Sequence, residues 1–148
     1  MSRWLLCEAM SVLICQVAFS GCGGMPAGPE TIEVTGTVTY QGTPVEGANV
    51  TFHPTSGSEQ TLASQGVTDN EGRFALSTHV GGGKFKPGIV PGQYGVAITK
   101  LDTAGISTTL GPPKDLLPRK YGSPTTSQLT ADVAAGTPNN FEFPLSDK

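Results

Sequence analysis

A chain of 148 residues is long enough for about one domain, since domains usually span roughly 50 to 250 residues. Its 20 glycines and 12 prolines disfavour helices and favour turns, and charged residues make up only 14% of the chain. The formal net charge of −3 and the lack of a basic run argue against nucleic acid as a partner. The composition predicts a small all-β domain.

Residues 1–21 have the pattern of an export signal. Arg3 supplies the positive start, and residues 9–19 form an apolar stretch that Ser11 and Gln16 interrupt. The stretch is shorter and more polar than a bilayer-spanning helix, which needs roughly 20 apolar residues. Glu8 is unusual in such a signal, and a start at Met10 would leave a cytosolic chain without Arg3.

The end of this signal resembles the lipobox of bacterial lipoproteins, in which small residues precede a cysteine that is acylated and becomes the mature N-terminus. Ser20 and Gly21 are the small residues here, and Phe19 stands where Leu, Val or Ile is usual. The resemblance implies lipidation of Cys22 and attachment to membrane lipid, because two or three acyl chains hold a protein stably. A plain secretory signal cut after Gly21 is the alternative.

Residues 22–31 follow as a short flexible tether rich in glycine and proline, and residues 32–148 form the predicted domain. All three cysteines, Cys7, Cys15 and Cys22, precede that domain. Disulfides therefore cannot stabilise it, and burial and strand pairing must do so.

The domain begins with alternating apolar and polar residues over 32–40, which predict a half-buried strand. Gln41 and Gly42 predict a turn, and residues 49–53 predict a strand that points Val50 and Phe52 inward and ends at Pro54.

Residues 65–68 and 73–78 flank the turn at residues 69–72 and predict a β-hairpin, with Val67 on its first strand. Residues 79–88, which include four glycines, are expected to form an exposed, mobile loop. Residues 93–100 then alternate again and predict a strand.

The last third contains a long loop and a final strand pair. Residues 101–127 lack periodicity and predict a long excursion, with Leu116, Leu117 and Pro118 as the part that packs on the core. Residues 129–133 and 141–145 alternate around a turn, which predicts a last hairpin.

Three stretches together resemble the carboxypeptidase regulatory-like, or transthyretin-like, domain: VTGTVTYQGTPVEGANVTF, GVTDNEGRFAL and GIVPGQYGVAITK. The match covers residues 31–100, and the tail resembles that of small lipoproteins of planctomycete-type bacteria. This resemblance implies a seven-stranded antiparallel β-sandwich of the prealbumin-like, Ig-like kind.

Few residues indicate chemistry. His53 and His79 are the only histidines, and no spacing typical of a metal site includes them. Asp69 begins a turn that resembles a calcium loop, but Arg73 and Val80 occupy the fifth and twelfth positions, where ligands are needed.

Iron-dependent intradiol dioxygenases on a related sandwich use two tyrosines and two histidines as ligands. Tyr40, Tyr94 and Tyr121 supply the number, but the histidines are not closely spaced and Tyr40 and Tyr94 are expected to face inward. No serine has the surroundings of an activated nucleophile. The interpretation is therefore of a protein that is not an enzyme, with no catalytic residues, metal or cofactor.

The expected function is that of an exported lipoprotein, anchored at the outer membrane or the periplasmic face of a bacterial membrane. It would serve as a structural or interaction module whose partner is an envelope protein or glycan. The alternative is a carbohydrate- or peptide-binding accessory domain, which requires an exposed aromatic ring. Phe85 is the candidate for that ring.

Overall fold

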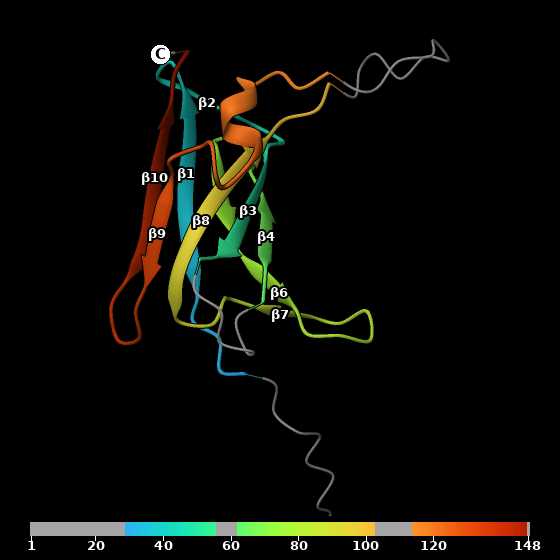
Figure 1. The fold of residues 1–148 in the computed structure, drawn as a ribbon, viewed down its shortest axis with the longest axis vertical. Helices are drawn as coiled ribbons and strands as arrows, with labels where there is room; N and C mark the ends of the chain where they lie inside the picture. Colours follow the sequence, from blue (N-terminus) through green and yellow to red (C-terminus); the bar gives the residue numbers. More distant parts are fainter. Residues whose placement is uncertain (1–28, 56–61, 103–113, 148) are drawn as a thin grey trace, which may run out of the picture.

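The computed structural model describes residues 29–55, 62–102 and 114–147, so the expected signal and Cys22 lie outside the described residues. The described residues form a β-sandwich with one short 3₁₀ helix (Figure 1). The elements in chain order are β1 (Val34–Tyr40), β2 (Thr43–Pro44), β3 (Asn49–Pro54), β4 (Ser64–Val67), β5 (Arg73–Ala75), β6 (Ser77–His79), β7 (Phe85–Pro87), β8 (Gly92–Thr99), η1 (Arg119–Gly122), β9 (Thr130–Val133) and β10 (Asn139–Leu145).

The strands belong to two sheets. The smaller sheet has the order β10-β1-β2, with β5 also paired to β1, and the larger has the order β7-β6-β4-β3-β8-β9. The predicted all-β sandwich is confirmed. The described residues form ten strands instead of the expected seven, and β1 pairs with β10 in parallel instead of antiparallel. A parallel pair arises because the last strand returns beside the first after a long connection.

The expected hairpin at residues 65–78 divides between the two sheets. After the turn, β5 pairs with β1, whereas β6 pairs with β4. The switch occurs at Leu76, whose backbone N–H donates to the carbonyl of Val34 and whose carbonyl accepts from the N–H of Gly88. The chain thus hydrogen-bonds to both sheets while the Leu76 side chain enters the core. Such a change of sheet is a known way to make a sandwich corner.

The prediction of a last hairpin is wrong. Both strands form, but they do not pair with each other. β9 pairs with β8 in the larger sheet, and β10 pairs with β1 in the smaller one. The turn between them therefore connects the two layers. The amide of Asn139 holds this turn through hydrogen bonds with the backbone of Ala134 and Thr137.

The alternation along the predicted strands places the core as expected. Val50, Phe52 and Tyr94 are fully buried, and Phe74 and Leu76 are nearly so. Val67 is different, because it lies on the outer side of β4 with 60% of its surface exposed while Ser64 takes the buried position.

The centre of the core is an aromatic cluster around Phe52. Its ring centroid lies 5.9 Å from those of Tyr94 and Phe141 and 6.1 Å from that of Phe143. Phe74 stacks on Phe143 at an interplanar angle of 16°. Offset and edge contacts of this kind add to the free energy of burial.

Gly36 makes room for this cluster. A Cβ atom at this position would lie 2.2 Å from the carbonyl oxygen of Phe141 and 2.6 Å from Cζ of Phe74. The glycine occupies the inward position between Val34 and Val38, where the two neighbouring strands leave no space for a side chain.

The segment expected as a long loop is partly core. Leu117 and Tyr121 are buried, whereas Leu116 is 49% exposed. The Tyr121 hydroxyl donates to the carbonyl of Ser146 at 3.1 Å and accepts from its N–H at 3.0 Å. Residues 114–122 therefore cover one end of the sandwich; residues 103–113 lie outside the described part.

The same segment covers the outer face of β8. Pro124 lies against Gly95, and the Ser127 hydroxyl donates to the carbonyl of Val96. β8 is consequently buried on both faces from Tyr94 to Ile98, which a simple alternation does not predict.

We predict that Gly36→Ala lowers the free energy of unfolding by about 3 kcal/mol, because the methyl group must displace backbone. Gly122→Ala is the matched control, since its nearest contact is an ordinary 3.6 Å to Thr99. Urea titration monitored by circular dichroism measures both, and equal midpoints for the two variants would contradict the packing.

Tyr121→Ala is expected to lower the free energy of unfolding by about 3 kcal/mol, because it leaves a cavity at the end of the core. Leu116→Ala, five residues earlier and half exposed, should change it by less than about 0.5 kcal/mol. Thermal unfolding of the two variants tests whether this segment belongs to the core. If it were only a loop outside the core, neither substitution would change the free energy of unfolding.

Candidate functional site

The sequence candidates for metal binding do not converge in the structure. His53 lies on β3 and His79 at the end of β6, with β4 between these strands in the sheet. Within the described ranges, no group of three or more histidine, cysteine or acidic side chains could hold a metal ion.

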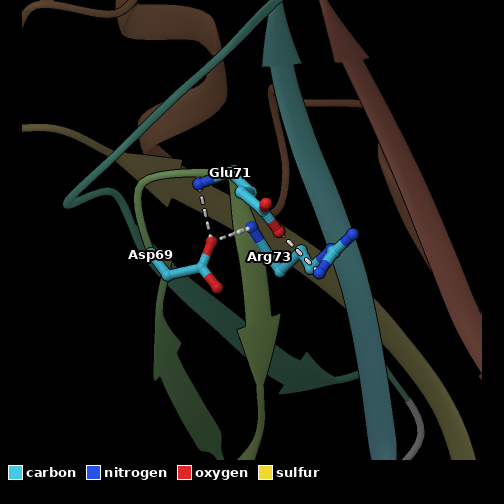
Figure 2. A network of polar contacts seen from close by, with 3 residues as sticks. All are labelled: Asp69, Glu71 and Arg73. Atoms are coloured by element: carbon cyan, nitrogen blue, oxygen red, sulfur yellow. Dashed lines mark hydrogen bonds and ion pairs between the residues drawn. The ribbon is translucent and has the colours of Figure 1, made fainter.

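The carboxylate of Asp69 accepts hydrogen bonds within its own turn. One carboxylate oxygen accepts from the N–H of Glu71 at 2.9 Å and from that of Arg73 at 2.8 Å (Figure 2). Glu71 in turn pairs with the Arg73 guanidinium at 2.5 Å on the surface. Gly72 closes the turn with a φ of +73°, and a Cβ there would lie 2.5 Å from the carbonyl oxygen of Val38. The predicted turn is confirmed.

The tyrosine hydroxyls also have structural partners. Tyr94 donates to the carbonyl of Val90 at 2.6 Å, and burial raises its pKa to about 12. Tyr40 donates to the carboxylate of Asp147, and this hydrogen bond is the main cause of its raised pKa. A tyrosine ligand to iron must ionise, and both pKa shifts oppose ionisation.

Tyr121 has the opposite shift. Desolvation acts to raise its pKa, but the hydrogen bonds with Ser146 and the nearby Lys120 outweigh that effect and lower it. The Lys120 ammonium lies 4.8 Å from the centre of the Tyr121 ring. The hydroxyl nevertheless has a structural role, because its hydrogen bonds join η1 to the residue that follows β10.

The most distinctive surface feature lies on the β6–β7 hairpin, where residues 79–88 were expected to form only a loop. His79 pairs with Phe85 across the two strands, and their ring centroids lie 5.2 Å apart in an edge-on arrangement. Phe85 is 56% exposed, as expected for the one aromatic candidate. Phe85 lies on β7, the edge strand of the larger sheet, so its ring is open to solvent.

An open cavity of about 170 Å³ adjoins these two rings. Its lining combines hydroxyl, amide and imidazole groups with the Phe85 ring, from residues Thr51, Ala63, Ser64, Gln65, His79 and Phe85. Ser64 is not available for a ligand, because its hydroxyl bonds to that of Thr78 at 2.7 Å in the interior.

The first described residues are fastened to β7. The carbonyl of Pro29 accepts from the Lys86 ammonium at 2.8 Å, and the Thr31 hydroxyl donates to the carbonyl of Pro87 at 2.8 Å. Ile32 and Ile89 then exchange two backbone hydrogen bonds. Figure 1 shows the chain reaching the sandwich at the end where β6 and β7 lie, opposite the C-terminus. We call this the N-terminal end of the sandwich.

Phe85 was predicted from the sequence as an exposed ring, whereas the residues that surround it were not. The spacing of His79 and Phe85, six residues apart across three glycines, is compatible with a hairpin. The fastening of residues 29–32 to β7 has no signal in the sequence, because it depends on a contact between segments more than 50 residues apart.

Asp69→Ala is expected to lower the free energy of unfolding by about 2 kcal/mol, because it leaves two turn N–H groups without their acceptor. Glu71→Ala removes only an exposed ion pair and should cost less than about 0.5 kcal/mol. Chemical denaturation of both variants tests this, and a larger effect from Glu71 would contradict the assignment.

Comparison with known proteins gives one similarity. The model of a family described as "Domain of unknown function (DUF6795)" matches residues 34–96. The match extends from the start of β1 into β8 and leaves out η1, β9 and β10, so it covers less than half of the chain. No curated protein and no solved structure matches. Among the described residues, no helix has the length and apolarity needed to cross a bilayer. The chain is thus similar to that family from β1 into the first part of β8.

Proposed function

We propose that this protein is an exported bacterial lipoprotein, anchored through acylated Cys22, whose β-sandwich acts without catalysis as a structural or interaction module of the cell envelope. The observation that carries the proposal is the Phe19-Ser20-Gly21-Cys22 stretch placed seven residues before Pro29. Pro29 is already bound to β7, so the folded domain follows the acylation site directly.

The hydrogen bonding of the polar side chains supports a non-catalytic role. Three of the groups that could perform acid–base chemistry hold the fold: Asp69 in its turn, Tyr94 on Val90 and Tyr121 on Ser146. Asp115 accepts from the N–H groups of Lys100 and Leu117, which fixes the start of the segment that covers the core. Side chains committed in this way are not poised for proton transfer.

The second candidate is a carbohydrate- or peptide-binding accessory domain. The exposed Phe85 ring beside a cavity with polar lining favours it, since sugar rings stack on aromatic faces while hydroxyl and amide groups orient them. Titration of the protein with envelope glycan fragments, compared with Phe85→Ala, tests this candidate. Loss of binding in the variant would support it, and equal binding would remove Phe85 from the site.

Cys22→Ser should abolish incorporation of a labelled fatty acid, because the thiol is the acceptor of the acyl group. The variant should also leave the membrane fraction or remain as an unprocessed precursor. Cys15→Ser is the matched control and should keep both the label and the membrane location. Mass spectrometry that finds an unmodified Cys22 in the mature wild-type protein would contradict the anchor.

A further inference from the structure

We infer that the β6–β7 hairpin contacts the lipid surface of the membrane that holds the anchor, with Phe85 as the residue that enters the headgroup region. This inference rests on the proposed acylation of Cys22. It adds an orientation to the proposed function, because it places the N-terminal end of the sandwich against the bilayer and the opposite end away from it.

The first step is the length of the tether. Seven residue steps separate Cys22 from Pro29, and a fully extended chain of that length spans at most about 25 Å. The lipid-bearing residue therefore stays within a short distance of the position where Pro29 lies.

The second step is where the tether leaves the domain. Pro29 accepts a hydrogen bond from Lys86, the residue next to Phe85, and Thr31 is bonded to Pro87. The tether thus reaches the folded domain on β7 itself. A strand of eight residues such as β8 extends about 26 Å, so the opposite end of the sandwich lies farther from the bilayer by roughly that length.

The third step is the chemistry of the hairpin. Phe85 is 56% exposed, and Lys84 and Lys86 flank it. Residues 79–88 include two lysines but no acidic residue, in a chain whose net charge is −3. An exposed aromatic ring on a hairpin that carries two cations and no acidic residue suits the boundary between acyl chains and anionic headgroups.

The tip of the hairpin has open space around it. Gly81, Gly82 and Gly83 form the tip of the hairpin, and Cβ atoms added to them would meet nothing within 4 Å. All three have positive φ, which lets the chain reverse there without side chains that would hold the tip away from a flat surface. The tip of the hairpin is therefore open to its surroundings in the described fold.

A single tryptophan placed at the contact tests the inference. The chain has one tryptophan, Trp4, which lies in the signal that processing at Cys22 removes, so the acylated mature protein provides a background without that fluorophore. In this protein, Phe85→Trp probes the hairpin and Leu116→Trp is the matched control, since Leu116 is also exposed but lies beside Tyr40 and Thr43 at the opposite end. The acylated proteins are purified from membranes and reconstituted in phosphatidylethanolamine and phosphatidylglycerol vesicles with or without brominated acyl chains.

We expect the tryptophan at position 85 to shift its emission to shorter wavelength in vesicles and to lose intensity with brominated lipid. The tryptophan at position 116 should do neither. Val80 follows β6 directly, on the other side of the glycine tip from Phe85, and Val80→Trp should also be quenched. This second probe keeps the test valid if the substitution at position 85 disturbs folding. Absence of quenching at both hairpin positions would overturn the inference.

The outcomes separate this inference from the proposed function. Labelled, vesicle-bound protein without hairpin quenching would refute the membrane contact and leave the lipid anchor standing. Protein without acyl label would refute both. A tryptophan at position 85 that responds to a peptidoglycan fragment but not to brominated lipid would assign the hairpin to a glycan instead, and would also refute the contact.

Discussion

Phe52 packs against aromatic rings from both sheets, and this contact holds the two layers of the sandwich together. Phe52 comes from the larger sheet, and three of its aromatic partners, Phe74, Phe141 and Phe143, come from the smaller one. No disulfide is possible in the domain, so this contact between layers must supply much of the stability. Gly36 permits it, because the smaller sheet needs a position without a side chain where these rings meet.

The two sheets are joined where the chain passes from one layer to the other. The chain changes sheet at Leu76, and again at the turn between β9 and β10. Each crossing ties a segment of one sheet to the other through the backbone. The sheet edges are short or carry proline: β9 has four residues, β7 contains Pro87 and β10 contains Pro144. These features discourage pairing with other chains at the edges.

The two ends of the sandwich differ in character. The end near the C-terminus is closed by Leu117 and Tyr121, with the Tyr121 hydroxyl fastened to Ser146. The N-terminal end carries the exposed Phe85 and the point where the chain enters the fold. One end of the sandwich is therefore closed by buried side chains, and the other leaves an apolar ring exposed.

The pattern of residues is enough to predict the strands that need only an apolar core to pack against. Alternation placed Val50, Phe52, Tyr94 and Phe74 inside, because a half-buried strand must turn every second residue away from water. The turn at Asp69 was also predictable, because its hydrogen bonds are local. Phe85 was also predictable as a surface aromatic, because it lies outside every stretch of alternating apolar and polar residues.

The pairing of the strands, and therefore the contacts between distant residues, could not be predicted from that pattern. The parallel partnership of β1 with β10, the change of sheet at Leu76 and the fastening of Pro29 to β7 each join segments that are distant in the chain. Strand pairing uses backbone groups that every residue other than proline possesses, so the side-chain pattern does not specify the partner. The burial of Tyr121 was hidden for a related reason, because one residue of a short 3₁₀ helix shows no periodicity.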